Sequence, residues 1–311
     1  MRPSIVVGYD QMPQTLLALD EAAAEADRRA GVLTVVHAFQ RATWAARPGT
    51  EPISAETAHA GARRIAERGA DHVRSRHPGL EVRTLAAEGS TATVLTEAAR
   101  DADLLVVGCH GHVAGLVLGS VTARVATRPG RPTMIVRGGR HEPRGTVLAA
   151  VDIDEPADRI LAFAFDDARL RRTGLKAISV RESFWPRTYA GDTGGLRAAS
   201  IQGEDNADLT LQDLLRPWQA EYPEVHVRRE LADGPAATIL IAASSHADVI
   251  VAGAHHHSTQ GRPTGDAHLG PTIHPLLLRT DCPVVIVPHS PVRAGPRSAR
   301  QPSADRHAPA R

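Results

Sequence analysis

Two groups of residues in the first half of the chain have the types and positions needed to bind an anionic ligand. Asp10 follows the apolar run "SIVVG" (4 to 8), and its carboxylate could accept hydrogen bonds from sugar hydroxyl groups. A second group begins at the last residue of the apolar run "DLLVVG" (103 to 108): Gly108, Gly111, Gly119 and Ser120. Glycines permit close backbone approach, and the amides at the start of a following helix can bind an oxyanion. The alternatives are an ordinary turn with Ser120 as a helix cap, and an Asp10 that only caps the next turn.

The other reactive residues do not combine into a known catalytic or metal-binding motif. The chain contains no GxSxG or HExxH motif, and its single lysine, Lys176, excludes a Walker loop. Cys109 lies beside the glycine loop, where it is either an activated thiol or, as we favour, a buried and inert one. Histidines occur in corresponding loops of the two halves, at 110, 112 and 255 to 257. No cysteine or carboxylate stands at ligand spacing from them, so we expect no metal site and no catalytic residues.

Composition excludes several classes of partner. The chain has 311 residues, with 36 Lys and Arg against 35 Asp and Glu. This balance argues against nucleic acid or a membrane surface as a partner. No apolar run approaches the roughly 20 residues of a membrane span, and the start of the chain lacks a secretory signal. We therefore expect a soluble, cytoplasmic protein.

The chain contains two copies of one unit. Residues 88 to 108 align without a gap with residues 233 to 253. The matched pairs include Gly89 with Gly234, Asp103 with Asp248 and Gly108 with Gly253. We predict a first domain over 1–140 and a second over 145–289, each with its own core, followed by a disordered tail over 290–311. These two units are called the first and second repeat below.

Within each repeat, short apolar runs alternate with helical patterns. The expected strands of the first repeat are 4–8, 33–38, 81–86, 103–108 and 133–137. Those of the second repeat are 146–151, 175–180, 225–231, 248–253 and 283–287. Continuous apolar strands separated by helices favour a parallel sheet covered on both faces, so the fold class is α/β with two tandem doubly wound domains. Ligands bind such sheets at the carboxyl ends of strands, which is where Asp10 and Gly108 lie.

The order of these motifs resembles the universal stress protein family. The first strand ends in Val-Gly-x-Asp, and "LTVVHAF" (33 to 39), "ADLLVVGCHG" (102 to 111) and "LGSVTARVATRPGRPTMIVR" (118 to 137) follow in the family's order. The duplicated layout resembles the tandem-domain members and covers roughly residues 3 to 289. The resemblance implies a five-stranded parallel sheet in each domain, in the order 3-2-1-4-5 and flanked by helices on both faces. It also implies a homodimer and association through the last strands, "TMIVR" and "VVIVP".

By the same resemblance, the ligand is ATP or a related adenine nucleotide. Asp10 would contact the ribose, while Gly8 and the backbone around Ala38 would line the base pocket. Gly108 and Gly111 would wrap the phosphates. The terminal phosphates would lie on Gly119, Ser120 and Val121. Magnesium, when bound, would be held mainly by the phosphates.

Two departures from the family pattern affect this expectation. Only seven residues separate Gly111 from Gly119, two fewer than is usual in nucleotide-binding members. Three outcomes are open for the shorter loop: it still binds the phosphates of ATP, it reaches only a diphosphate, or it folds over an empty pocket. In the second repeat, His256 replaces the second glycine and Pro271 replaces the serine, which removes an amide donor and a hydroxyl. We therefore expect nucleotide mainly in the first repeat.

The predicted function is that of a stress-response or regulatory protein that binds an adenine nucleotide. One alternative is a nucleotide-free dimerisation scaffold. Another is a slow nucleotide hydrolase, with ATP hydrolysis at a low rate. The residues do not indicate the stress signal or the downstream partner.

Overall fold

The computed structural model describes most of both repeats. The described residues are 2–40, 54–109, 111–112, 117–127, 129–138, 143–181, 194–254 and 269–288. The tail predicted over 290–311 lies outside them. Among the described residues, no helix combines the length and the apolar character needed to cross a bilayer.

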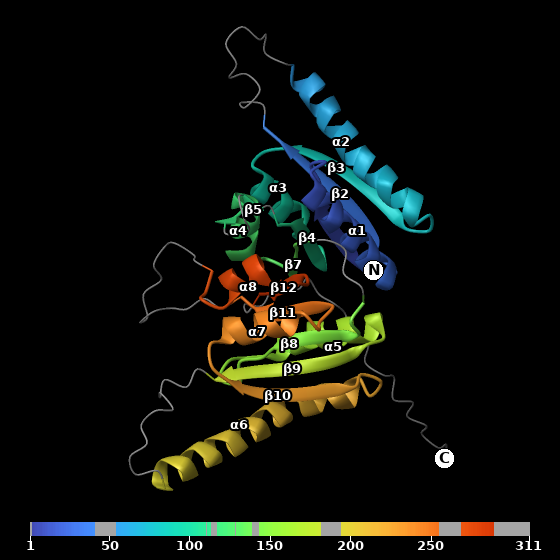
Figure 1. Cartoon of the computed structure of the whole chain (residues 1–311). Helices are drawn as coiled ribbons and strands as arrows, with labels where there is room; N and C mark the ends of the chain where they lie inside the picture. The colour runs from blue at the N-terminus through green and yellow to red at the C-terminus, as the bar shows by residue number, and fades with distance from the viewer. Residues whose placement is uncertain are drawn as a thin grey trace, which may run out of the picture.

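Strands and helices alternate in both repeats, as the apolar pattern predicts (Figure 1). The first repeat contains β1 (Ser4–Gly8), α1 (Pro13–Arg28), β2 (Val32–Phe39), α2 (Ala55–Arg76), β3 (Glu81–Glu88), α3 (Thr91–Ala98), β4 (Leu104–Gly108), β5 (Gly111–His112), β6 (Val117–Leu118), α4 (Ser120–Thr127) and β7 (Thr133–Val136). The second contains β8 (Thr146–Ala150), α5 (Asp158–Arg171), β9 (Gly174–Arg181), α6 (Gly194–Glu221), β10 (Val227–Asp233), α7 (Ala236–Ser244), β11 (Val249–Gly253), α8 (Ile273–Arg279) and β12 (Val284–Val287). Every predicted strand is present, and its ends differ from the prediction by at most two residues.

The strands of both repeats form one sheet of ten strands, in the order β10-β9-β8-β11-β12-β7-β4-β1-β2-β3. Within each repeat the order is 3-2-1-4-5 with parallel neighbours, which confirms the predicted fold class. The two fifth strands, β7 and β12, pair antiparallel, with Val284 opposite Ile135. The edges that the resemblance marks for association therefore meet within this chain. This pairing removes two exposed sheet edges, which is a favourable outcome for any sheet.

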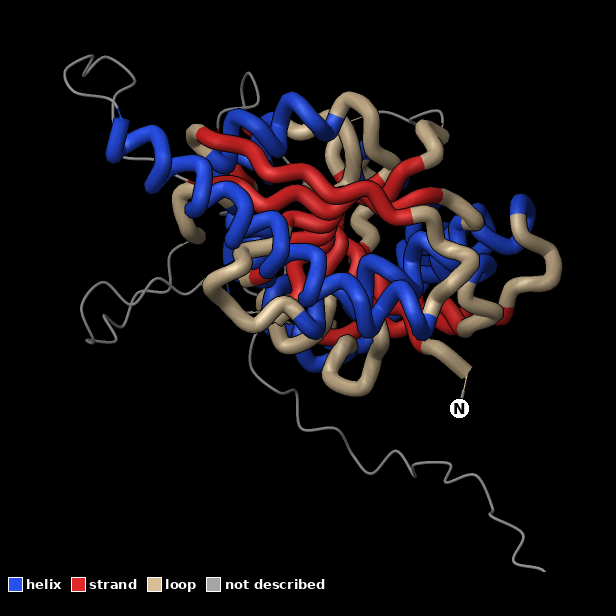
Figure 2. Tube along the Cα trace, turned by 90° about the horizontal axis from the view of Figure 1, so that it is seen from below, coloured by secondary structure: helices blue, strands red, loops and turns tan. Residues whose placement is uncertain are grey.

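Helices cover both faces of the sheet (Figure 2). One apolar core contains side chains from α1, α2, α5 and α6, and the other contains side chains from α3, α4, α7 and α8. Strand residues alternate between them, so Ile5 and Val7 enter the first core and Val6 enters the second. Each core includes residues of both repeats. Each core therefore continues from one repeat into the other where β7 pairs with β12, while the division into two domains stays a prediction.

The aspartates that the repeat alignment matches hold the strands in place. The Ser4 amide donates to Asp103 Oδ2 at 2.9 Å, and the Thr146 amide donates to Asp248 Oδ2 at 3.0 Å. In each repeat the carboxylate thereby satisfies the first amide of the first strand. Asp103 and Asp248 therefore stabilise the fold, since a buried amide without an acceptor costs free energy.

A cluster of ion pairs forms a second contact between the repeats, joining α1 to α5. The side chains of Glu25 and Asp167 are 0% exposed. Glu25 accepts hydrogen bonds from Arg28 at 2.6 Å and from Arg29 at 3.0 Å, and it also pairs with Arg171. Asp167 accepts from Arg29 at 3.1 Å and from Arg171 at 2.7 Å. These five residues are called the α1–α5 charge cluster.

The two buried carboxylates of this cluster have opposite pKa shifts. Burial acts to raise the pKa of Glu25, but the charges of Arg171, Arg28 and Arg29 outweigh it and hold that pKa at about 2. The pKa of Asp167 is raised, first by burial and then by the charge of Glu25. Because the folded pKa of Glu25 lies below the unfolded value of 4.5, its contribution to stability is complete above pH 4.5 and is lost as the pH falls towards 2. At neutral pH, Glu25 is therefore the ionised centre of the cluster.

Candidate functional site

A cavity of about 450 Å³ opens at the carboxyl ends of β1, β2 and β4 in the first repeat. Seven of the eight predicted site residues line it: Gly8, Asp10, Ala38, Gly108, Gly119, Ser120 and Val121. The eighth, Gly111, pairs with Leu118, which lines the cavity. The cavity lies between β1 and β4, where the winding of the sheet reverses, which is the usual ligand position in this architecture.

The turn after β1 shows that Asp10 has a structural role. Asp10 Oδ1 accepts hydrogen bonds from the Thr15 hydroxyl at 2.7 Å and from the Met12 amide at 3.1 Å. Gln11 between them has a left-handed backbone, with φ at 70°. In the second repeat Asp152 Oδ1 accepts from the amide two residues later in the same way, at 3.0 Å. The capping interpretation of this aspartate therefore holds in both repeats, and Asp10 also lies exposed at the cavity.

Two of the motif glycines lie where a neighbouring helix approaches the strand end closely. A Cβ at Gly108 would lie 2.6 Å from the Gln14 carbonyl oxygen at the start of α1. A Cβ at Gly8 would lie 2.9 Å from Leu95 Cδ1. The contact at Gly108 is with backbone, so a side chain there would push α1 away from the end of β4, whereas the contact at Gly8 is with the tip of the Leu95 side chain, which can move aside. The cavity exists between these closely packed elements.

The walls of the cavity are largely apolar. Val36, Leu95 and Val107 supply aliphatic surface, and all three belong to the core that contains α3 and α4. Two lining residues were not predicted from the sequence: His37, whose Nδ1 lies 2.8 Å from the Tyr9 carbonyl oxygen, and Thr15, which bridges Asp10 to α1. Burial raises the pKa of Tyr9, and the charge of Asp10 adds to the effect. An apolar wall with a few convergent polar groups is the usual character of a small-molecule site.

The start of helix α4 lines the same cavity as Asp10. Gly119, Ser120, Val121 and Thr122 all line the cavity. The Thr122 hydroxyl donates to the Gly108 carbonyl at 3.2 Å, which ties the first turn of α4 to the end of β4. Amides in the first turn of a helix have no acceptor within the helix, and with the helix dipole they attract an anion. The equivalent place in the second repeat holds Pro271, and α8 starts only at Ile273.

The shortened loop folds partly as a hairpin. Gly111 pairs with Leu118 and His112 pairs with Val117. Leu118 lines the cavity and packs against the apolar core that α8 of the second repeat also contacts. The loop therefore contributes an apolar wall beside the start of α4. Residues 113–116 lie outside the described residues.

Cys109 matches the inert alternative. Its residue is 5% exposed, and burial raises the pKa of its thiol although Arg137 acts in the other direction. A raised pKa keeps the neutral thiol, which is not a nucleophile. The histidines at 110 and 255 to 257 lie outside the described residues. Within the part of the chain that the structure describes, no three His, Cys, Asp or Glu residues are placed to hold a metal ion.

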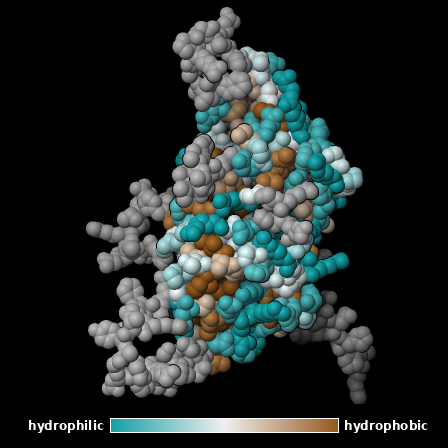
Figure 3. Space-filling model, in the orientation of Figure 1, coloured by the Kyte–Doolittle hydropathy of each residue, from teal (hydrophilic) through white to brown (hydrophobic). Residues whose placement is uncertain are grey.

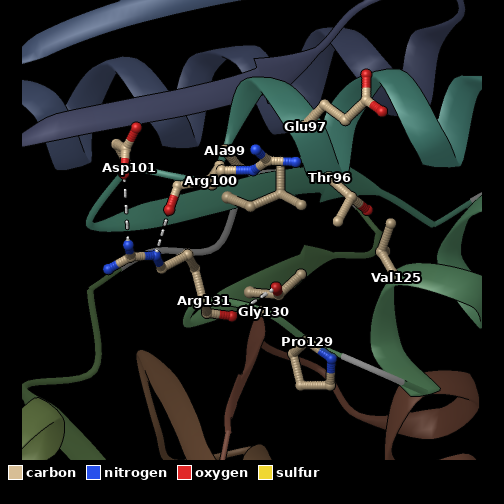
Figure 4. A pocket seen from close by; sticks show the side chains of 11 residues that line it. Thr96, Glu97, Ala99, Arg100, Asp101, Val125, Pro129, Gly130 and Arg131 are labelled. Atoms are coloured by element: carbon tan, nitrogen blue, oxygen red, sulfur yellow. Dashed lines mark hydrogen bonds and ion pairs between the residues drawn. The ribbon is translucent and has the colours of Figure 1, made fainter. Parts of the chain in front are cut away.

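A second cavity of the first repeat, about 430 Å³, lies near the amino ends of β4 and β7 (Figure 4). Arg131 Nε donates to the Arg100 carbonyl at 2.7 Å, and its guanidinium lies 3.9 Å from Asp101. The lining of this second cavity contains two arginines and two acidic residues, Asp101 and Glu97, so its charges cancel. It contains none of the predicted site residues, so the cavity at the carboxyl ends remains the candidate site.

Known proteins match this chain along nearly its whole length. The model of the universal stress protein family matches residues 1–137 and again residues 143–288. A universal stress protein of Mycobacterium tuberculosis, Rv2005c, is 28% identical over 270 residues, which are 81% of this chain and 86% of that protein. Another from the same organism, Rv3134c, is 32% identical over 170 residues, covering 54% of this chain and 59% of that protein.

A solved structure confirms the architecture. The crystal structure of a universal stress protein from Archaeoglobus fulgidus DSM 4304 superposes with a TM-score of 0.66 at 16% identity and covers 93% of this chain and 100% of that one. At this identity the likeness concerns the fold alone. Taken with the two family matches, it leads to one conclusion: the chain belongs to the universal stress protein family, with two copies of the family's unit in tandem.

Proposed function

We propose that this stress protein binds ATP or a related adenine nucleotide in the cavity of the first repeat. The observation that carries the proposal is the lining of that cavity. It combines an aliphatic wall, the Asp10 carboxylate and the first turn of α4 around a space of about 450 Å³. An adenine nucleotide has the matching parts, namely a flat apolar base, a sugar with hydroxyl groups and a polyanionic tail.

Each part of the nucleotide has a matching group of residues. The base would lie against Val36, Ala38 and Leu95. The ribose hydroxyls would donate to Asp10, which the Thr15 hydroxyl holds in place. The phosphates would lie on the amides of Gly119, Ser120 and Val121, together with the Ser120 hydroxyl. Bound nucleotide would also bring the magnesium ion that usually accompanies it, held mainly by the phosphates.

The second repeat would contribute little to binding. Pro271 has neither an amide hydrogen nor a hydroxyl at the position that corresponds to Ser120. Ala150 stands where the first repeat has Gly8. A homodimer, which the family resemblance implies, would have to use a surface other than the fifth strands, because β7 and β12 are already paired with each other.

The direct test is mass analysis of small molecules released when the purified protein is denatured. We expect an adenine nucleotide in amounts approaching one per chain. The last wash of the folded protein serves as the control for free nucleotide. If the released fraction contained no nucleotide and added ATP did not raise the melting temperature, the scaffold alternative would replace this proposal.

A further inference from the structure

The second repeat has a cavity of about 440 Å³ that belongs to no site described above. It lies near the amino ends of β8 and β9, beside the end of α7, which is the opposite end of the sheet from the carboxyl-end clefts. Leu148 and Ala243 give it an apolar floor. Figure 3 shows apolar surface in the part of the second repeat where α7 and β9 lie, with hydrophilic residues beside it.

Two cations face each other across neighbouring strands in this cavity. Lys176 on β9 is directly opposite Arg228 on β10 in the parallel register, and both line the cavity. Adjacent strands are about 4.8 Å apart, and like charges that are directly opposite destabilise a sheet. Lys176 is compensated by Glu230, whose Oε2 lies 2.6 Å from its Nζ. Within the described residues, the structure records no polar partner for the exposed Arg228 guanidinium.

The other charged and polar groups described around the cavity favour an anionic ligand. Asp248 lies close by, but its two oxygens accept hydrogen bonds from three backbone amides, those of residues 144 to 146. The Arg144 guanidinium donates to the Ser244 carbonyl at 2.7 Å and adds positive charge at that end. His226 and His246 line the cavity as further hydrogen-bond donors. None of the described lining residues is acidic, in contrast to the cavity of Figure 4.

We propose that this cavity binds a small phosphate monoester with an apolar substituent. Arg228 and Lys176 would hold the phosphate, because the anion supplies the counterion that Arg228 lacks and a guanidinium matches phosphate geometry. Leu148 and Ala243 would contact the apolar substituent. The site is separate from the proposed nucleotide cavity and does not depend on it.

The chain offers its own reporter for the test, since Lys176 is the only lysine. Methylation of lysine amines with a carbon-13 label keeps the positive charge, and it gives one side-chain signal in the NMR spectrum of the full chain. Phenyl phosphate is the probe, because it joins a phosphate to an apolar ring. We expect a saturable shift of the Lys176 signal. Arg228→Gln should weaken the binding of phenyl phosphate about tenfold, the usual effect of losing one charge-assisted hydrogen bond.

Arg229→Gln is the matched control. Arg229 is the next residue on β10, and its side chain points to the other face, where it pairs with Asp208 at 2.8 Å. The Arg229→Gln substitution removes the same charge from the same strand, but on the face away from the cavity. Solvent screens a charge at that distance, so binding of phenyl phosphate should change less than about twofold. The proposal is wrong if the Lys176 signal does not shift saturably, or if the two variants weaken binding equally.

Discussion

Replacing Glu25 with glutamine is expected to lower the free energy of unfolding by about 3–5 kcal/mol, the usual cost of breaking a buried ion pair from one side. Glu25 is the ionised centre of the α1–α5 charge cluster, and its side chain is 0% exposed. Glutamine has nearly the same shape but no charge, so Arg29 and Arg171 would keep only Asp167 as a buried counterion, and Arg28 would keep only the half-buried Glu21. Urea unfolding followed by circular dichroism measures the change.

Glu21→Gln is the matched control for this prediction. Glu21 pairs with Arg28 and Arg171 at the rim of the same cluster, but its side chain is 27% exposed. Ion pairs at a solvent-accessible rim contribute about 0–1 kcal/mol, so this variant should remain near the wild type. Equal losses in the two variants, or a Glu25→Gln protein as stable as the wild type, would show that the buried cluster does not hold the repeats together.

Ser120→Pro is expected to abolish the stabilisation that ATP gives to the folded chain. Ser120 is the first residue of α4, where proline is well tolerated because its missing amide hydrogen has no partner in the helix. The substitution should therefore leave the fold intact while it removes an amide donor and a hydroxyl from the cavity. A ligand at about 100 times its Kd stabilises by about 2.7 kcal/mol, and this whole gain should vanish. Thermal unfolding with and without ATP measures it.

The reciprocal variant, Pro271→Ser, tests whether the effect is specific to the first repeat. It restores an amide and a hydroxyl in the second repeat, where Ala150 still occupies the place of Gly8 and α8 begins later than its counterpart. Stabilisation by ATP should stay at the wild-type level. If both variants lost the stabilisation, or if neither did, the assignment of the nucleotide to the start of α4 would fail.

The apolar pattern of the sequence was enough to predict the strands and their order. A run such as "DLLVVG" (103 to 108) is buried on both faces, so its signal is local and does not depend on distant residues. The joining of the two sheets could not be predicted in the same way. The resemblance marked "TMIVR" and "VVIVP" as contact edges, but no local signal says that the partner of β7 is β12 of the same chain.

The α1–α5 charge cluster could not be predicted from the sequence for a related reason. A glutamate in an amphipathic helix ordinarily faces solvent, and Glu25 is buried only because α5 of the second repeat packs against it. Spacing likewise identified Gly108 as a loop glycine, whereas the structure shows that the approach of Gln14 requires it. Contacts with residues far away in the sequence decide whether such a residue is buried, and the residues next to it in the sequence do not predict them.

The most direct test of the nucleotide assignment is a calorimetric titration of the full chain with ATP and, in parallel, with ADP. In the first repeat the start of α4 presents amides and the Ser120 hydroxyl to the cavity, whereas Pro271 stands at the corresponding place of the second repeat, so we predict a single binding event with one nucleotide per chain. A titration without binding heat at several temperatures, or one that fits two equal sites per chain, would contradict the account.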